Sequence, residues 1–223
     1  MGVIMSINFE LLYEVFPQLM QGFFVSLQIA LGASFLGILF GILIGIEQAK
    51  HKSIIYIFSQ MYVAVIRGTP MLIQIAAMYY LLQSAGIAIS AFWSAIISIG
   101  LNSGAYMSQV ILSGIQSISK GQSEAAQVLG FTKWQTLRYI VLPQAIQSVM
   151  PSIGNEFVTL VKDSSLASTI GVYELTKQGE VIMSKTYDAP TIYFALGCMY
   201  FITTTVVSLI VHYFDKKRNH VVH

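Results

Sequence analysis

Five apolar stretches, separated by polar segments, dominate the hydrophobic pattern of the chain. The first runs from Gly22 to Ile46, and about 20 apolar residues in a helix suffice to cross a hydrocarbon core about 30 Å thick. The other four cover about residues 70–84, 91–112, 144–165 and 191–214. The pattern therefore predicts an all-α, polytopic membrane protein with five transmembrane helices, forming a single transmembrane domain over residues 1–223.

The apolar run over residues 53–82 is too long for one untilted span, and the sequence RGTP interrupts it. Thr69 can cap a helix, and Pro70 suits the first helical position, where a missing N–H does no harm. We therefore expect an interfacial helix over about residues 54–66 and a second span that starts near Pro70. Arg67 would then lie at the water boundary, either as an interfacial anchor or as part of a cytoplasmic gate.

Small residues recur at regular spacing in the first span. Its glycines are four or five residues apart, at positions Gly32, Gly37, Gly41 and Gly45. Glycines at this spacing allow the backbones of two membrane helices to approach closely. We interpret them as a packing feature.

Composition supports a membrane protein. Hydrophobic residues make up 55% of the chain and charged residues only 10%, whereas soluble domains carry about 25% charged residues. A net charge of +2 is too small to indicate a nucleic-acid partner, and the single cysteine, Cys198, excludes an intrachain disulfide. The first residues have no cationic segment and no small-residue cleavage site, so we expect no removed signal peptide.

The distribution of cations predicts the orientation of the chain. Because cytoplasmic loops are enriched in Lys and Arg, the side with nine cations is expected to be cytoplasmic. These nine are Lys50, Lys52, Arg67, Lys120, Lys133, Arg138, Lys216, Lys217 and Arg218, against Lys162, Lys177 and Lys185 on the other side. The N-terminus is then outside, the C-terminus is cytoplasmic, and the polar segment 113–142 is cytoplasmic.

The segment over residues 113–142 has the pattern of two short helices joined by a turn, a unit called the helical knuckle below. A short helix carries Glu124, Ala125 and Ala126, Leu129 provides an apolar anchor, and Gly130 can end the helix in the left-handed conformation. A second helix follows in FTKWQTLRYIVL. A knuckle with small residues on its exposed part suits insertion into a groove of another protein. The alternative is an amphipathic loop that lies on the lipid headgroups.

Two predicted spans carry polar stripes, and polar groups inside a membrane are costly enough to indicate function. In the third span, helical spacing places Asn102, Tyr106 and Gln109 on one face. In the fourth span, it places Ser152, Glu156, Thr159 and Asp163 on one face. These stripes could line a polar passage, or they could satisfy one another in helix packing. A carboxylate near the outer end of a span, such as Asp163, could pair with an α-ammonium or guanidinium group.

Positions 124–143 carry EAA, then three residues, G, nine residues and I-x-LP. This spacing resembles the EAA loop of ABC importer membrane subunits. Further sequence segments resemble one branch of this family, the polar amino acid permeases. These segments are RGTPMLIQ at 67–74, LNSGAYMSQVILSGIQSISKGQSEAAQVLGF at 101–131, LPQAI at 142–146, GNEF at 154–157 and KDSSLASTIGVYEL at 162–175. The resemblance covers the chain beyond about residue 16. One departure is Ser123, where the family often carries a large aromatic residue.

The resemblance implies a Type I importer fold in which residues Glu124 to Gly130 form the coupling helix that docks on the ATP-hydrolysing subunit. It also implies that an amino acid binds in a transmembrane cavity, which supports Asn102, Glu156 and Asp163 as cavity residues. The sequence GxxxxGK[ST] is absent from the chain, so ATP and Mg²⁺ are expected on a separate ATPase and this chain is not itself an enzyme.

The other implied partners are an extracellular or periplasmic solute-binding protein and a second permease chain, identical or paralogous, in a bacterial inner membrane. We expect no cofactor or metal in this chain. The polar outer residues Lys177, Glu180 and Lys185 are interpreted as a solvated surface or as a docking rim for the receptor.

Three classes of function compete on this sequence. Paired acids favour an importer of a basic amino acid such as arginine, with glutamine, glutamate and cystine still open. The alternative is an ion-coupled secondary amino acid transporter with Asp163 or Glu156 as the proton site. Such carriers are usually built from internal repeats, and the halves of this chain show no convincing similarity. A membrane scaffold that recruits an ATPase would explain the knuckle but not the two polar stripes.

Overall fold

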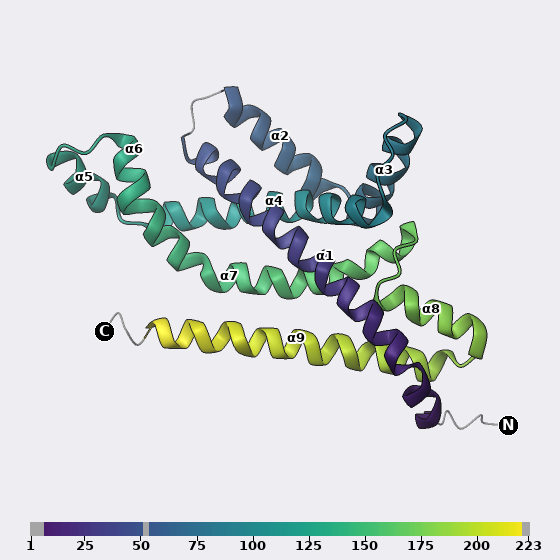
Figure 1. The fold of residues 1–223 in the computed structure, drawn as a ribbon. Coiled ribbons are helices and arrows are strands. Elements are labelled where there is room, and N and C mark those ends of the chain that lie inside the picture. Colours follow the sequence, from purple (N-terminus) through teal and green to yellow (C-terminus); the bar gives the residue numbers. More distant parts are fainter. Residues whose placement is uncertain (1–6, 51–53, 220–223) are drawn as a thin grey trace.

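The computed structural model describes residues 7–50 and 54–219, and this part of the chain is entirely helical, as predicted (Figure 1). Its helices are α1 (Phe9–Ala49), α2 (Ile54–Gly68), α3 (Met71–Ser84), α4 (Ala91–Ser117), α5 (Lys120–Val128), α6 (Lys133–Thr136), α7 (Leu142–Asp163), α8 (Leu175–Thr186) and α9 (Ala189–Asn219). A π-helical segment, Leu137–Val141, joins α6 to α7 without a turn, and a 3₁₀ helix, Ser164–Ile170, follows α7.

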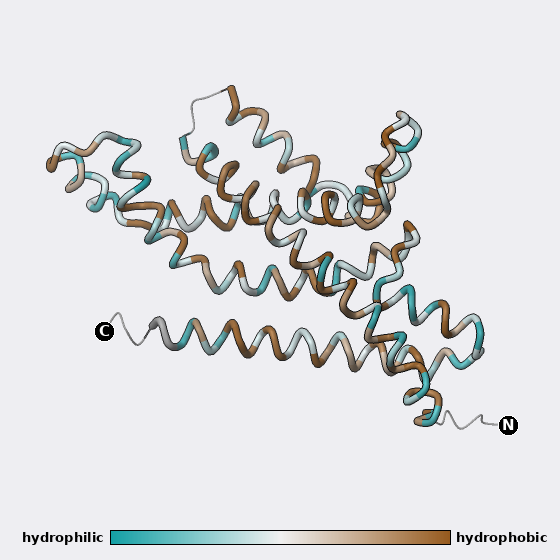
Figure 2. The backbone as a smooth tube through the Cα atoms, viewed as in Figure 1, coloured by the Kyte–Doolittle hydropathy of each residue, from teal (hydrophilic) through white to brown (hydrophobic). Residues whose placement is uncertain are grey.

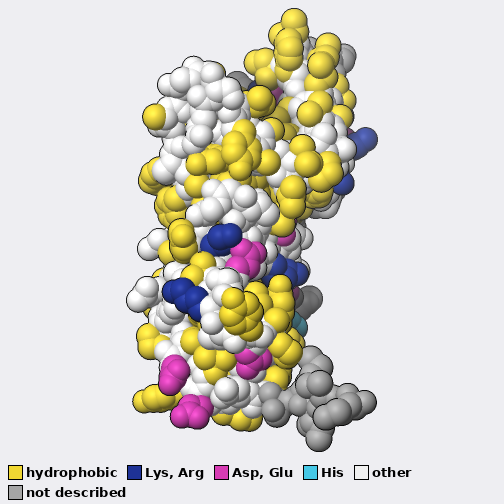
Figure 3. Space-filling view, turned by 90° about the vertical axis from the view of Figure 1, so that its right-hand side faces the viewer, with side chains coloured by type: hydrophobic (Ala, Val, Ile, Leu, Met, Phe, Trp, Pro, Cys, Tyr) yellow, Lys and Arg dark blue, Asp and Glu magenta, His cyan; other side chains and the backbone are white. Residues whose placement is uncertain are grey.

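The two ends of the molecule are built differently. The α5–α6 turn projects at one end of the molecule, and α8 packs against the N-terminal part of α1 at the other (Figure 1). Hydrophilic residues collect in these two end regions, whereas the long helices between them are mostly hydrophobic (Figure 2). The end that carries α8 shows acidic and basic side chains among hydrophobic ones (Figure 3).

The longest helix, α1, has 41 residues and a length of about 61 Å, so it extends well beyond the predicted span over residues 22–46. It packs along α4 through its glycines. A Cβ atom added to Gly41 would lie 2.3 Å from Cβ of Met107, and one added to Gly37 would lie 2.5 Å from Oγ of Ser103. Only glycine permits so close an approach, which confirms the packing interpretation of these positions.

The buried core follows α1 and α4 and extends to α7. One apolar cluster joins these helices to α3 and the 3₁₀ helix through residues such as Ile29, Ile75, Ile99 and Leu160. A second cluster lies at the α8 end and includes Leu19, Leu175, Ile182, Ile192 and Leu196. Large apolar side chains outside these clusters are exposed along α1 and α9, as expected where helices meet lipid.

Three helices of the described residues, α1, α4 and α9, are long and apolar enough to cross a membrane on their own. The α7 helix has 22 residues, about 33 Å, but its many polar residues keep it outside this set. The predicted number of five spans stays a prediction.

The helices α2 and α3 form a bent pair, and the predicted interfacial helix and second span in this region stay predictions. Their axes are bent by 107° at the break, and only together do they pass the length and composition test for a span. Alone, α3 has 14 residues and is about 21 Å long, which is too short to cross the hydrocarbon core. The break lies where expected, because Pro70 has an extended backbone and no N–H to continue the helix.

Candidate functional site

The break between α2 and α3 is held by the side-chain amide of Gln74. Its Nε2 donates to the carbonyl oxygens of Ile66 and Thr69, at 2.7 and 3.1 Å, and to Oγ1 of Thr69 at 2.7 Å. Its Oε1 accepts a hydrogen bond from Nδ2 of Asn102 on α4, at 3.0 Å. Carbonyl groups freed at a helix break find no partner in lipid, so this amide satisfies them from within the protein.

Arg67 lies beside the middle of α4. Its guanidinium carbon is 5.1 Å from the centroid of the Tyr106 ring, a cation–π contact. Because α4 runs from Ala91 to Ser117, Tyr106 lies close to its centre. The helix α2 packs against α1 and α4 and brings the break beside the middle of α4. The expected place of Arg67 at the water boundary, as an anchor or as part of a gate, stays a prediction.

A neighbouring face of α4 contacts α7 through a carboxylate. Oγ of Ser103 donates to Oε1 of Glu156 at 2.8 Å. Ser103 is buried and directly follows Asn102, so two consecutive residues of α4 connect the helix break on one side to an acid of α7 on the other. Asp163 is half-buried at the last position of α7, where the 3₁₀ helix begins.

The residues of the predicted stripe on α7 differ in how far they are exposed. Glu156 and Asp163 are half-buried, whereas Ser152 and Thr159 are exposed. Oγ1 of Thr159 donates to the carbonyl oxygen of Asn155, 3.3 Å away on the same helix. The exposed side is also wider than predicted, because it includes Ser148, Asn155 and Lys162. The described chain thus leaves a polar strip of α7 uncovered.

Gln109, the third member of the predicted stripe on α4, takes part in helix packing. Its Nε2 donates to Oε1 of Gln48 on α1 at 2.7 Å. Gln48 is fully buried, and its Nε2 finds no hydrogen-bond partner among the described residues. The buried amide of Gln48 and the half-buried amide of Gln109 therefore connect the C-terminal part of α1 to α4.

The α5–α6 turn has the helix–glycine–helix form predicted from the sequence. Gly130 has φ +82°, its N–H donates to the carbonyl of Gln127, and the N–H of Phe131 donates to that of Ala126. This pair of bonds is a Schellman ending of α5. The helix starts at Lys120, directly after Ser119.

The exposed part of this turn differs from the prediction in one residue. Ala126 is buried at 1% exposure, while Ala125 and Glu124 are exposed. The apolar side chains of Val128 and Leu129 are 88% and 74% exposed. An apolar tip of this kind is suited to a protein contact.

A buried carboxylate, Glu174, was not singled out by sequence reasoning. Its side chain caps α8 by accepting from the N–H groups of Thr176 and Lys177, at 3.0 and 2.8 Å. It also accepts from the hydroxyls of Ser26 on α1 and Tyr200 on α9, both at 3.1 Å. Burial raises the pKa of the Glu174 carboxyl, against these hydrogen bonds, which lower it. One carboxylate thus connects α1, α8 and α9.

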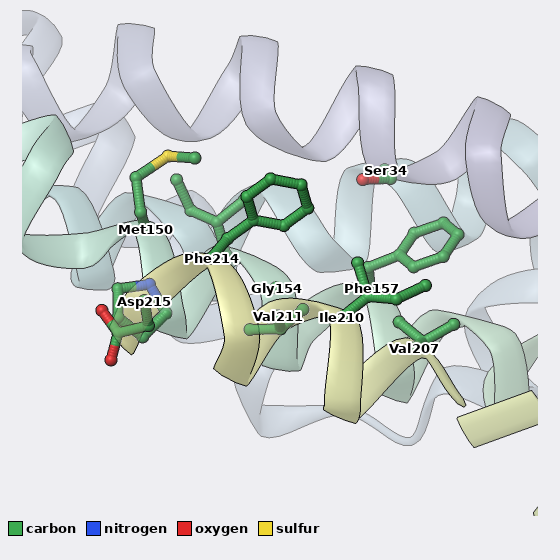
Figure 4. A pocket seen from close by; sticks show the side chains of 11 residues that line it. Ser34, Met150, Gly154, Phe157, Val207, Ile210, Val211, Phe214 and Asp215 are labelled. Atoms are coloured by element: carbon green, nitrogen blue, oxygen red, sulfur yellow. The ribbon is translucent and has the colours of Figure 1, made fainter. Parts of the chain in front are cut away.

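An apolar pocket of about 480 Å³ lies between α1, α7 and α9. Side chains of α7 and α9, such as Phe157 and Ile210, surround it, and Ser34 reaches it from α1 (Figure 4). Asp215 is its one charged lining residue. With so few polar groups it does not suit a polar solute, so the candidate site for such a solute is the polar group around α4.

Residues 37–220 match the family described as binding-protein-dependent transport system inner membrane component. The chain belongs to this family and is a multi-pass inner membrane protein. This membership confirms the resemblance to ABC importer permeases that the EAA pattern predicts.

Similar proteins cover almost the whole chain. The glutamine transport system permease protein GlnP of Escherichia coli (strain K12) is 33% identical over 215 residues, which are 96% of this chain and 98% of the relative. A crystal structure of an amino acid ABC transporter with histidines is 34% identical, with a TM-score of 0.87 over 95% of this chain and 99% of the other. The methionine ABC transporter MetNI, in an inward-facing form, shares the fold at 18% identity and a TM-score of 0.72.

Proposed function

We propose that this chain forms half of the membrane passage of an ATP-driven importer for polar amino acids. The observation that carries the proposal is the convergence on the middle of α4. Asn102 bonds the amide of the α2–α3 break, Ser103 bonds Glu156 of α7, and Tyr106 contacts Arg67. Broken helices near the middle of a membrane are where transporters bind their solutes, because backbone and side-chain polar groups are gathered there.

The uncovered polar strip on α7 supports a second permease chain. Exposed hydroxyl, amide and ammonium groups on a membrane helix are unfavourable against lipid. Two copies, or one copy and a paralogue, would place two such strips around one aqueous passage. The ATPase would bind the apolar tip of the α5–α6 turn, on the cytoplasmic side with the C-terminus, and a solute-binding protein would dock at the end that carries α8.

The solute is proposed to be a basic amino acid such as arginine. Glu156 and Asp163 are the acids of α7, and a cation could exchange contacts between them. The histidines named for one similar structure support a basic solute, whereas the name of the Escherichia coli relative supports glutamine.

Reconstitution tests this function. The full chain, with its ATPase and binding-protein partners, is placed in vesicles, and ATP-dependent uptake is measured for arginine, histidine, glutamine, glutamate and cystine. We expect arginine uptake to require ATP and to fall at least tenfold in Asp163→Asn, with ATP hydrolysis less affected. Uptake that follows an ion gradient and ignores ATP would instead establish the ion-coupled transporter.

A further inference from the structure

A basic pocket lies at the base of the α5–α6 turn. It has a volume of about 480 Å³ and is formed where the C-terminal ends of α1 and α4 meet the inner faces of α5 and α6. Three lysines from three different elements line it: Lys50 after α1, Lys120 at the start of α5 and Lys133 at the start of α6. Residues 13 to 83 positions apart in the sequence thus bring their cations to one cavity.

The charge of this pocket is only partly balanced by the described residues. Lys50 forms an ion pair with Glu47 at 2.6 Å. Within the described residues, Lys120 and Lys133 have no ion pair, and no acidic residue lines the pocket. Three ammonium groups and one carboxylate leave a net charge of +2. Like charges gathered in this way favour the binding of an anion.

The lining is amphipathic. Polar groups of Ser123 and Gln127 come from the inner face of α5, while Ile46, Ile115 and Leu137 form an apolar wall. The strongly exposed Val128 and Leu129 lie elsewhere on the turn and do not line the pocket. The pocket is therefore separate from the apolar tip that is proposed to meet the ATPase.

From this combination we infer that the pocket binds the phosphate headgroup of an anionic phospholipid, with the glycerol and upper acyl carbons against the isoleucine wall. A freely diffusing anion would use the lysines but not the apolar wall, whereas a phospholipid uses both. The inference rests on the proposed cytoplasmic side of the turn, since basic pockets between membrane helices on that side suit anionic headgroups. The lipid would then contact α1, α4 and the coupling turn together.

Native mass spectrometry of the purified full chain tests this site without any transport assay. Phosphatidylglycerol and phosphatidylcholine with identical acyl chains are titrated separately. We expect preferential retention of phosphatidylglycerol, and a loss of about fivefold for each lysine removed, so about 25-fold in Lys120→Gln/Lys133→Gln. The matched control is Lys177→Gln/Lys185→Gln on α8, which removes the same charge at the other end and should change binding less than twofold.

Further variants decide between the possible outcomes. Lys120→Arg/Lys133→Arg keeps the charge and should retain the lipid, and thermal melting of each variant shows whether it is folded. Equal retention of the two lipids, or an equal loss in the α8 control, would overturn the site. Displacement of phosphatidylglycerol by millimolar inorganic phosphate would overturn the lipid assignment in favour of a free anion. None of these outcomes depends on which solute, if any, is transported.

Discussion

The two sides of α4 are packed by opposite means. Toward α1, glycines allow close contact, and Gly41 lies directly against Met107. Toward α7 and the α2–α3 break, the contacts are hydrogen bonds of Asn102 and Ser103. The α1 contact is closely packed and mostly apolar, apart from the hydrogen bond between Gln109 and Gln48, whereas Asn102 and Ser103 form polar contacts with Gln74 and Glu156.

We propose that this difference separates a structural contact from a functional one. An interdigitated contact at van der Waals distance has one favourable arrangement, since any shift creates overlap or a void. Hydrogen bonds between side chains can be exchanged for bonds to a solute or water at small net cost. We therefore expect α1 and α4 to move as one body, and α7 and the break to move relative to them.

The largest effect is expected at the glycine contact. Gly41→Leu would drive a side chain into Met107, and overpacking of this severity costs about 3 kcal/mol. The melting temperature of the purified chain in detergent measures the loss. Gly197→Leu on α9 is the matched control, because a Cβ at Gly197 meets no atom within 4 Å. Equal melting of the two variants would mean that the α1–α4 contact is not fixed.

The next effect concerns Glu174, which tests whether a polar contact can also be structural. Glu174→Ala removes the cap of α8 and leaves the hydroxyls of Ser26 and Tyr200 without their acceptor, at a cost of about 2 kcal/mol. Because burial raises the pKa of this carboxyl, its protonated form is favoured by folding. Stability is then highest below the ordinary pKa of 4.5 and falls as the pH rises through the raised value.

The pH dependence gives a separate measurement on the same residue. The melting temperature of the unchanged chain, relative to that of Glu174→Gln, should increase when the pH is lowered from 7 to 5. A difference that is independent of pH, or that decreases on acidification, would contradict the raised pKa.

A smaller loss of stability is expected at the polar side of α4. Ser103→Ala removes the hydrogen bond to Glu156, which is worth about 1 kcal/mol. Arginine uptake by the reconstituted importer should nevertheless fall more than it does in Ser94→Ala, a buried serine of the same helix whose hydroxyl has no hydrogen-bond partner among the described residues. If uptake in both variants falls only in proportion to the loss of melting temperature, the two sides of α4 do not differ in function.

The smallest effect on stability is expected at Thr159. Its hydroxyl is exposed and bonds only the backbone of its own helix, so Thr159→Val should change stability by less than about 0.5 kcal/mol. If the uncovered strip of α7 lines the passage, the same change should lower uptake. Val158→Ile, on a neighbouring face of α7, is the control.

Short-range features of the fold could be predicted from the sequence. The break at Pro70 and the left-handed ending at Gly130 are set by the backbone of one residue, so their positions are readable directly. The polar residues of α4 and α7 were also found, because helical spacing places them on one face.

Long-range partners could not be predicted in the same way. Gln74 pairs with Asn102 across 28 residues, and Ser26 with Glu174 across 148. Nothing in the local pattern distinguishes such an amide or acid from a surface residue. The bend between α2 and α3 depends on these partners, which is why its location beside the middle of α4 was missed.

The helical backbone is continuous from Lys133 to Asp163, through the π-helical segment and past Pro151 of α7, and this continuity has a mechanical consequence. Its 31 residues have a length along the helix of about 46 Å, so the segment can act as a lever arm with the α5–α6 turn at one end and Asp163 at the other. A tilt of about 5° about the turn would move the far end by about 4 Å. That is larger than the length of a hydrogen bond, so a modest torque at the turn could break and remake polar contacts along the whole segment.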